Sequence, residues 1–173
     1  GLFQVNIRDG QRMSAARAYL RPAMQRANLT VLTQAALTRI LIEDHVAIGV
    51  EYRMGDNLGG QLRRSKARRE VLLAAGAFNS PQLLMLSGIG PAAHLQQHGI
   101  AVAVDSPAVG TNLQDHLCVP MGWRLKPGAA SYNAQLRGLG LTGSVLRYLL
   151  QKRGPMTMPA ADIGVFCKSD PTL

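Results

Sequence analysis

The chain has 173 residues, 47% of them hydrophobic, and a formal net charge of +9 at neutral pH. This apolar content is typical of a globular protein and excludes an intrinsically disordered chain, and no apolar stretch reaches the roughly 20 residues that a membrane-spanning helix needs. Its two cysteines, Cys118 and Cys167, lack the spacing of a metal site or a disulfide framework and favour a reducing cytoplasm as its location.

The first part of the chain is predicted to form short helices followed by an antiparallel meander. An Ala-rich run over 14–20 and the proline at position 22 favour two helical segments that end near residue 26. Three β-favouring runs follow at 29–33, 37–42 and 46–52. After a glycine-rich turn, residues 61–69 are expected to return as a polar outer strand.

That outer strand holds the densest basic cluster of the chain, Arg63, Arg64, Lys66, Arg68 and Arg69. A positive net charge makes an anionic partner worth considering, such as nucleic acid, a membrane surface or a phosphate-bearing cofactor. No aromatic residue is interleaved with these cations, whereas nucleic-acid grooves combine cations with aromatic platforms. We therefore interpret the cluster as a solvated sheet edge that discourages aggregation, and we expect no nucleic-acid partner.

The middle of the chain has the pattern of a parallel α/β unit. Residues 71–75 are apolar without alternation, as expected for a strand buried on both faces of a parallel sheet. A helix is predicted over 81–87, capped by a serine or asparagine, begun by Pro81 and ended by Gly88 in a left-handed conformation.

The same pattern, a proline before the helix and a glycine after it, then repeats. Pro91 and Gly99 enclose a predicted helix over 92–98, and a strand at 100–104 and a loop over 105–115 follow.

The last third of the chain reads as the start of another domain. Strand-like runs at 119–125 and 163–166 flank a predicted amphipathic helix over 144–151.

The run from Gly76 to Gly90, which reads GAFNSPQLLMLSGIG, resembles the second sequence signature of the GMC (glucose-methanol-choline) oxidoreductases. Blocks at 14–20, 28–33 and 109–116 are similar to further family blocks in the same order. The resemblance is strongest to choline dehydrogenase-like and alcohol dehydrogenase-like members. It covers most of this chain but about the middle third of a typical family member, which implies an internal fragment whose partners include the missing parts of the same protein.

The resemblance implies an α/β fold with two partial domains. Residues 1–116 would belong to a Rossmann-like FAD-binding domain that contains the parallel strand and the antiparallel meander. Residues 117–173 would begin a substrate domain built on an antiparallel sheet.

The resemblance also implies a set of cofactor-facing positions. The main chain of Leu37 would contact the adenine of FAD, and the strand end at 75–76 would lie at the rim of the cofactor crevice, where open α/β sheets bind ligands. A loop over 112–116 would lie near the flavin. Ordinary roles stay open for all of them: a strand residue, a glycine turn, an Asx turn and a surface histidine. The set is Leu37, Ala75, Gly76, Asn112, Asp115 and His116.

The implied reaction is oxidation of the CH–OH group of a small-molecule alcohol, choline-like or other, to an aldehyde or ketone by hydride transfer to FAD. In the family, the base that removes the hydroxyl proton is a histidine that would lie beyond Leu173, so we assign no catalytic residue to this chain. The glycine-rich loop for the flavin pyrophosphate is also absent. We therefore expect the isolated chain to be inactive, and its electron acceptor stays open.

Three other functions stay open. They are a flavin-containing hydroxynitrile lyase of the same family, a non-enzymatic binding module and a nucleic-acid binder.

Two further motifs carry no predicted site. The G-x-G-x-x-G of residues 138–143, with Asp162 at a distance suited to a ribose contact, lacks the buried strand that must precede a dinucleotide loop. His94 and His98 lie four residues apart on the predicted helix 92–98, but no third ligand is evident, and no metal is expected.

Overall fold

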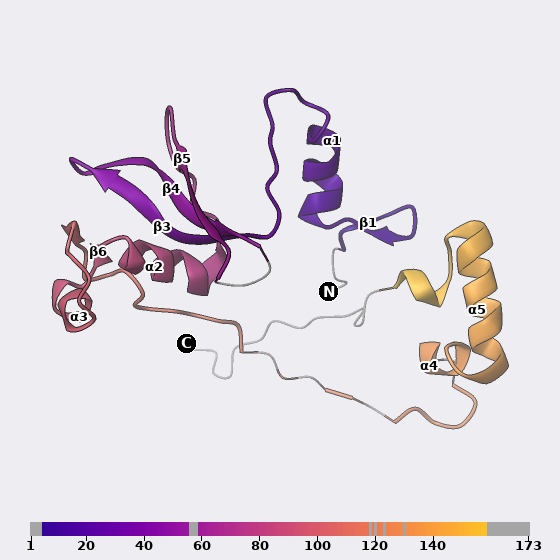
Figure 1. Ribbon diagram of the computed structural model, residues 1–173. Coiled ribbons are helices and arrows are strands. Elements are labelled where there is room, and N and C mark those ends of the chain that lie inside the picture. The colour runs from indigo at the N-terminus through magenta and orange to yellow at the C-terminus, as the bar shows by residue number, and fades with distance from the viewer. Residues whose placement is uncertain are drawn as a thin grey trace. The chain divides into compact units, whose positions relative to one another are not determined.

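The computed structural model describes residues 5–55, 59–117, 119, 121–122, 124–129 and 131–158. The chain divides into two compact units. The central unit is Leu32–Val119, and the flanking unit combines Gly1–Val31 with Pro120–Leu173. Figure 1 follows their elements along the chain. The division into a cofactor part over 1–116 and a substrate part over 117–173 stays a prediction.

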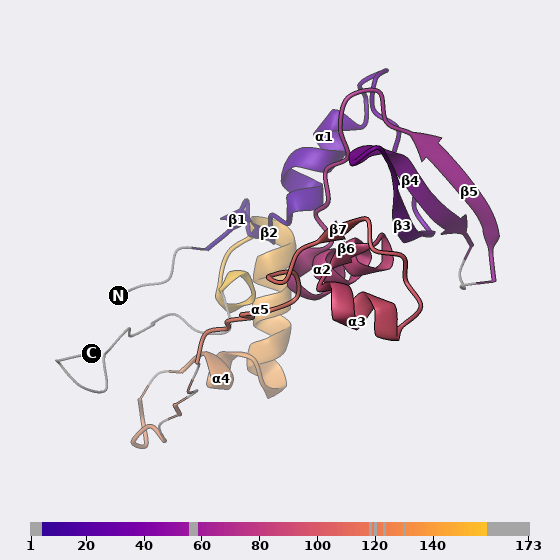
Figure 2. The same ribbon diagram turned by 90° about the vertical axis from the view of Figure 1, so that its left-hand side faces the viewer.

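A three-stranded antiparallel sheet forms one part of the central unit. Its strands are β3 (Ala35–Glu43), β4 (Val46–Met54) and β5 (Gln61–Lys66), in that spatial order (Figures 1 and 2). Asp44 and His45 join the first two strands with φ angles of +49° and +63°, which is the left-handed pair that a two-residue type I′ hairpin requires. The predicted meander is therefore present.

The meander differs from the prediction at its start. Residues 29–33 form no strand, and the first strand begins at Ala35, which pairs with Met54. The apolar run at 29–33 has strand-like composition but no strand beside it among the described residues. β5 has the predicted polar character, because all six of its residues are exposed.

The buried parallel strand predicted at 71–75 is wrong for the described chain. Residues 71–74 have no regular secondary structure, and Leu72 is 82% exposed. No described strand pairs with this segment, so an apolar run that composition marks as an inner strand has nothing here to be buried against. The parallel pairing of the central unit lies elsewhere, between β6 (Ile89–Gly90) and β7 (Val104–Asp105). Of the strand predicted at 100–104, only the final residue belongs to β7.

Two helices follow the sheet. α2 covers Gly76–Leu86 and α3 covers Ala92–Gln97. α2 therefore begins five residues before the predicted start at 81, and Pro81 lies inside it instead of opening it. The predicted stops are confirmed, since Gly88 and Gly99 follow the two helices with φ angles of +85° and +67°.

Buried side chains in the central unit come from the sheet and from both helices. Ile40 and Tyr52 on the sheet and Leu83 on α2 are buried, and Leu95 on α3 is fully enclosed. The amide of Ile40 donates a hydrogen bond of 2.8 Å to Ser87 Oγ just after α2. This bond covers the outer edge of β3 and fixes the end of α2 against the sheet.

The flanking unit contains a short hairpin and several helices. β1 (Ile7–Arg8) pairs with β2 (Gln11–Arg12), and a π-helical turn over Ala16–Leu20 continues directly into α1 (Arg21–Ala23), where two helical segments were predicted.

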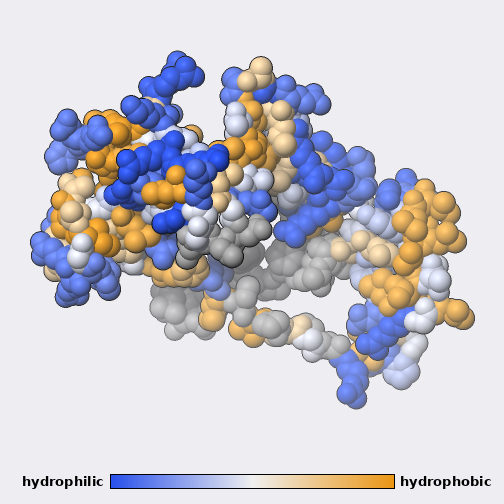
Figure 3. Space-filling model, in the orientation of Figure 1, coloured by the Kyte–Doolittle hydropathy of each residue, from blue (hydrophilic) through white to orange (hydrophobic). Residues whose placement is uncertain are grey.

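The carboxyl-terminal part of the flanking unit is helical. It contains α4 (Tyr132–Gln135), α5 (Gly138–Gln151) and a 3-10 turn at Pro155–Thr157. α5 contains the predicted amphipathic helix, and apolar surface gathers over it (Figure 3). Five of its leucines are exposed: Leu139, Leu141, Leu146, Leu149 and Leu150. The described residues of the run 119–125 form no strand, so that prediction is wrong for them. The run 163–166 lies outside the described residues.

Candidate functional site

A groove of about 370 Å³ runs along one face of α2. Its two walls are this helix and the loop over 110–114. Residues three or four apart on a helix lie on the same face, so one side of α2 lines the groove while Leu83 is buried. The lining residues are Ala77, Phe78, Pro81, Gln82 and Met85 from the helix, and Gly110, Thr111, Asn112, Leu113 and Gln114 from the loop.

The start of α2 is open beside this groove. Its N-cap is Ala75, which offers no side-chain cap, and the first turn contains no acidic residue. Gly76 has a φ of +89°, and a β-carbon placed on it would meet nothing within 4 Å. Ser80 Oγ accepts a hydrogen bond of 3.1 Å from the amide of Ala75. The first amides of the helix therefore lie at its positive end without an acidic side chain to neutralise them.

The loop opposite the helix approaches it closely at one point. Gly110 has a φ of +79°, and a β-carbon there would lie 3.4 Å from Met85 Cε. Asn112 also has a left-handed backbone, with a φ of +55°, a conformation that asparagine tolerates better than most residues. The Gln114 side-chain amide donates to Asn112 Oδ1 at 3.4 Å. Glycine and asparagine thus allow the loop to lie beside α2.

Of the six predicted site residues, Asn112 alone lines the groove, and Ala75 and Gly76 directly precede its first lining residue, Ala77. Asn112 lines the groove opposite the first turns of the helix that begins at Gly76. Asp115 and His116 follow in the chain just after the groove-lining loop; both are exposed, and the amide of His116 donates to Asp115 Oδ1 at 2.8 Å. Leu37 does not line the groove. The cofactor roles of all these residues stay predictions.

Leu37 lies near the start of β3, opposite Tyr52. The strand register shifts between Leu37 and Arg39, and Thr38 Oγ1 donates to the carbonyl of Glu51 at 3.0 Å. An irregularity of this kind redirects the backbone locally. The main chain of Leu37 therefore lies beside a local break in the ladder of β3.

Sequence reasoning missed the groove-lining face of α2. The helix was predicted to start at 81, so Phe78 fell in its cap region and its relation to Gln82 and Met85 could not be seen. Once the start at Gly76 is known, the spacing of 78, 82 and 85 identifies one helical face.

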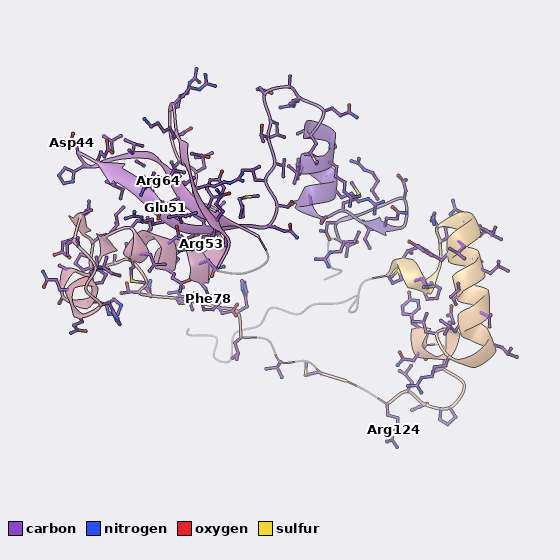
Figure 4. All side chains as sticks on the ribbon, viewed as in Figure 1. Asp44, Glu51, Arg53, Arg64, Phe78 and Arg124 are labelled. Atoms are coloured by element: carbon purple, nitrogen blue, oxygen red, sulfur yellow. The ribbon has the colours of Figure 1, made fainter. Side chains whose placement is uncertain are left out.

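Sequence reasoning also missed a buried carboxylate in the sheet. Glu51 on β4 binds Arg39 on β3 and Arg64 on β5, with Nε to carboxylate distances of 2.9 Å in both cases. Figure 4 labels Glu51 and Arg64. The Glu51 side chain is only 7% exposed. The hydrogen bond from Arg39, assisted by that from Arg64 and opposed by burial, lowers the pKa of Glu51 to about 2. A carboxylate held this way ties three strands together and is a poor proton donor or acceptor near neutral pH.

The two discounted motifs form no site in the described residues. The whole G-x-G-x-x-G run forms the first six residues of α5. Asp162 lies outside the described residues. The rings of His94 and His98 meet edge to face at 4.8 Å. Across the described part of the chain, no three metal-ligating side chains gather, and no helix has the length and apolar character needed to cross a bilayer.

Comparison with known proteins gives a consistent result. The sequence profile of the GMC oxidoreductases matches residues 1–118. An uncharacterised GMC-type oxidoreductase of Mycobacterium tuberculosis is 45% identical over 169 residues, which is 98% of this chain and 30% of that protein. The alcohol dehydrogenase [acceptor] of Pseudomonas putida is 41% identical over 174 residues, which is 99% of this chain and 31% of that protein.

Two further matches differ in coverage. The oxygen-dependent choline dehydrogenase of Rhizobium johnstonii is 52% identical over 117 residues, which is 68% of this chain and 20% of that protein. A crystal structure of formate oxidase superposes with a TM-score of 0.73 and 33% identity, covering 87% of this chain and 26% of that one. The chain thus spans about a third or less of the length of each relative.

Proposed function

The chain belongs to the GMC oxidoreductases, and from that premise we propose that it is part of an enzyme that oxidises the CH–OH group of a small-molecule alcohol to an aldehyde or ketone. FAD is the cofactor of this family, as the sequence predicted, and the mixed helix and strand fold is that of its FAD-binding domain. When bound, the flavin supplies a hydride acceptor. What this chain's own residues contribute is the placement of that group.

The observation that carries the proposal is the groove beside the open start of α2, which lies within the family signature from Gly76 to Gly90. The residues present suit a cofactor. The first amides of the helix have no acceptor within the helix itself, and its first turn contains no acidic residue. Gly76 leaves open space, and loop residues line the groove from the other side. A volume of about 370 Å³ is at the lower end of the ~300–1,000 Å³ of ligand pockets. The groove is therefore suited to one part of FAD and not to the whole molecule.

We assign the predicted residues to this cofactor as follows. The main chain at Ala75 and Gly76 admits the group to the helix start, and Asn112 contacts it from the loop. Asp115 and His116 follow the lining loop in the chain and would contact the same group from beyond the groove. Leu37, on β3, would form a separate contact through its main chain.

The pattern of similarity favours an alcohol other than choline as substrate. The alcohol dehydrogenase matches nearly the whole chain, whereas the choline dehydrogenase matches 68% of it. The predicted substrate domain begins near residue 117. The alcohol dehydrogenase match extends over 99% of the chain and so includes this domain. Small-molecule alcohols are therefore the first substrates to test.

We further propose that the isolated chain does not retain FAD. None of the groove-lining residues carries a charge that could hold a diphosphate. The chain also spans about 30% of the relatives that match its whole length.

The test uses the full-length protein that contains this chain. We expect it to purify with the visible absorbance of bound flavin, and we expect a panel of primary alcohols to bleach that absorbance under anaerobic conditions faster than choline does. Release of cyanide from cyanohydrins without flavin bleaching would instead indicate a hydroxynitrile lyase. A protein that holds FAD but is reduced by no alcohol would contradict the proposed reaction.

A further inference from the structure

The groove along α2 is uncharged. Its lining contains apolar side chains from Phe78, Met85 and Leu113 and neutral polar ones from Asn112 and Gln114, and no Asp, Glu, Lys, Arg or His. A neutral lining of this kind offers no opposite charge to pair with a charged group of a ligand, and burying such a group unpaired is costly. Its chemistry suits a ligand part that has apolar faces and polar edges.

Met85 and Phe78 lie nearly two helical turns apart in the wall that α2 contributes to the groove. Met85 comes close to the loop at Gly110, where an added β-carbon would lie 3.4 Å from its methyl group. Phe78, nearly two turns earlier on the same helix face, is 75% exposed (Figure 4). A phenyl ring at a groove wall with this much free surface gains most from a flat ring stacked on it.

Pro81 adds an acceptor to the same wall. Proline has no N–H, so the carbonyl of Ala77, four residues earlier, lacks its α-helical donor. Ala77 lines the groove. The helix wall thus contains Phe78 and, at Ala77, a carbonyl without its α-helical donor, and the loop wall contains Asn112.

We propose that this groove receives an uncharged flat heterocycle with hydrogen-bonding edges, and that Phe78 retains it by stacking. The inference rests on the proposed function and makes it more specific. FAD contains two such rings, the flavin ring and the adenine. The diphosphate between them must be held by other residues, because the groove lacks any cation.

The first test compares variants of the full-length protein in their affinity for FAD, measured by titrating the apoprotein. Loss of one aromatic stacking contact is worth ~1–3 kcal/mol, so Phe78→Ala should raise the Kd for FAD about 5- to 150-fold. Phe78→Leu keeps apolar bulk without the ring, so its Kd for FAD should lie between those of the wild type and of Phe78→Ala. Leu86→Ala is the matched control, because Leu86 is on the same helix but lines a different hollow, and it should leave the Kd unchanged.

The second test asks which ring is held. If the groove holds the flavin ring, Phe78→Leu should change the visible absorption and circular dichroism of bound FAD. If it holds the adenine, the Kd should rise while the visible spectrum of the bound fraction stays that of the wild type.

A third variant tests the neutral lining. Asn112→Asp is isosteric and adds one negative charge, and we expect it to weaken FAD binding at pH 7 and to weaken it less at pH 4. An unchanged Kd in both Phe78→Leu and Asn112→Asp, in a wild type that binds FAD, would overturn the inference and leave the proposed reaction intact. A wild type that binds no FAD would overturn both.

Discussion

Gly88 and Gly99 allow the effect of backbone strain to be separated from the effect of crowding. Both follow a helix with a left-handed backbone, at φ +85° and +67°. A β-carbon on Gly88 would lie 2.5 Å from the carbonyl oxygen of Ala101 and 3.1 Å from the amide nitrogen of Ala103, whereas one on Gly99 would meet nothing within 4 Å. Alanine at either site costs about 1–2 kcal/mol for the left-handed conformation.

Crowding adds a second cost at Gly88 alone. Inserting a carbon into a packed site costs about 1–3 kcal/mol, so we expect about 2–5 kcal/mol for Gly88→Ala against about 1–2 kcal/mol for Gly99→Ala. The Gly88 carbonyl accepts hydrogen bonds from the amides of Ala103 and Val104 at 2.8 and 3.1 Å. The extra strain should therefore open the β6–β7 pairing first.

Hydrogen exchange of the full-length protein measures this opening directly. The crowding cost of about 1–3 kcal/mol corresponds to a change of about 5- to 150-fold. Amides 103 and 104 should therefore exchange at least about fivefold faster in Gly88→Ala than in Gly99→Ala. The urea midpoint should fall further in the first variant as well. Equal exchange in both variants would refute the argument from crowding.

Two other predictions concern the sheet. Ser87→Ala leaves the buried amide of Ile40 without its acceptor, so the free energy of urea unfolding should fall by about 1–3 kcal/mol. Ser65→Ala removes only a hydroxyl that bonds a neighbouring side chain, so this free energy should fall less. Equal losses would contradict the reasoning. Because the pKa of Glu51 is lowered from 4.5 to about 2 in the folded protein, its contribution to stability is complete above pH ~4.5 and is lost as the pH falls toward 2. Glu51→Gln should be less stable than the wild type at pH 7, and its stability should not show the fall between pH ~4.5 and 2 that comes from Glu51. Identical pH profiles of the urea midpoint in the two proteins would show that the carboxylate does not stabilise the fold.

The features that the sequence predicted well are helix ends and tight turns, which a few local residues determine. Gly88 and Gly99 terminate helices because few other residues adopt a left-handed backbone, and this preference is local. The hairpin between the runs predicted at 37–42 and 46–52 is likewise defined locally, by the left-handed pair Asp44 and His45. Such features depend on a few adjacent residues, so they can be seen without knowledge of the rest of the fold.

Features that depend on distant partners could not be predicted in this way. The run 71–75 has the composition of a buried strand, but composition does not say whether a neighbouring strand is present. The bond between Ile40 and Ser87 joins residues 47 positions apart, and the Glu51 pairs depend on the register of three strands. The groove escaped prediction because the start of α2 was placed after Phe78.

Met85 links the sequence choices at two distant glycines. A β-carbon on Gly90 would lie 2.8 Å from Met85 Cγ, and one on Gly110 would lie 3.4 Å from its methyl group. The long thioether side chain occupies volume that larger residues at 90 or 110 would need. Homologous proteins in which position 90 carries alanine should therefore carry a shorter residue at 85, so that the two positions covary across evolution.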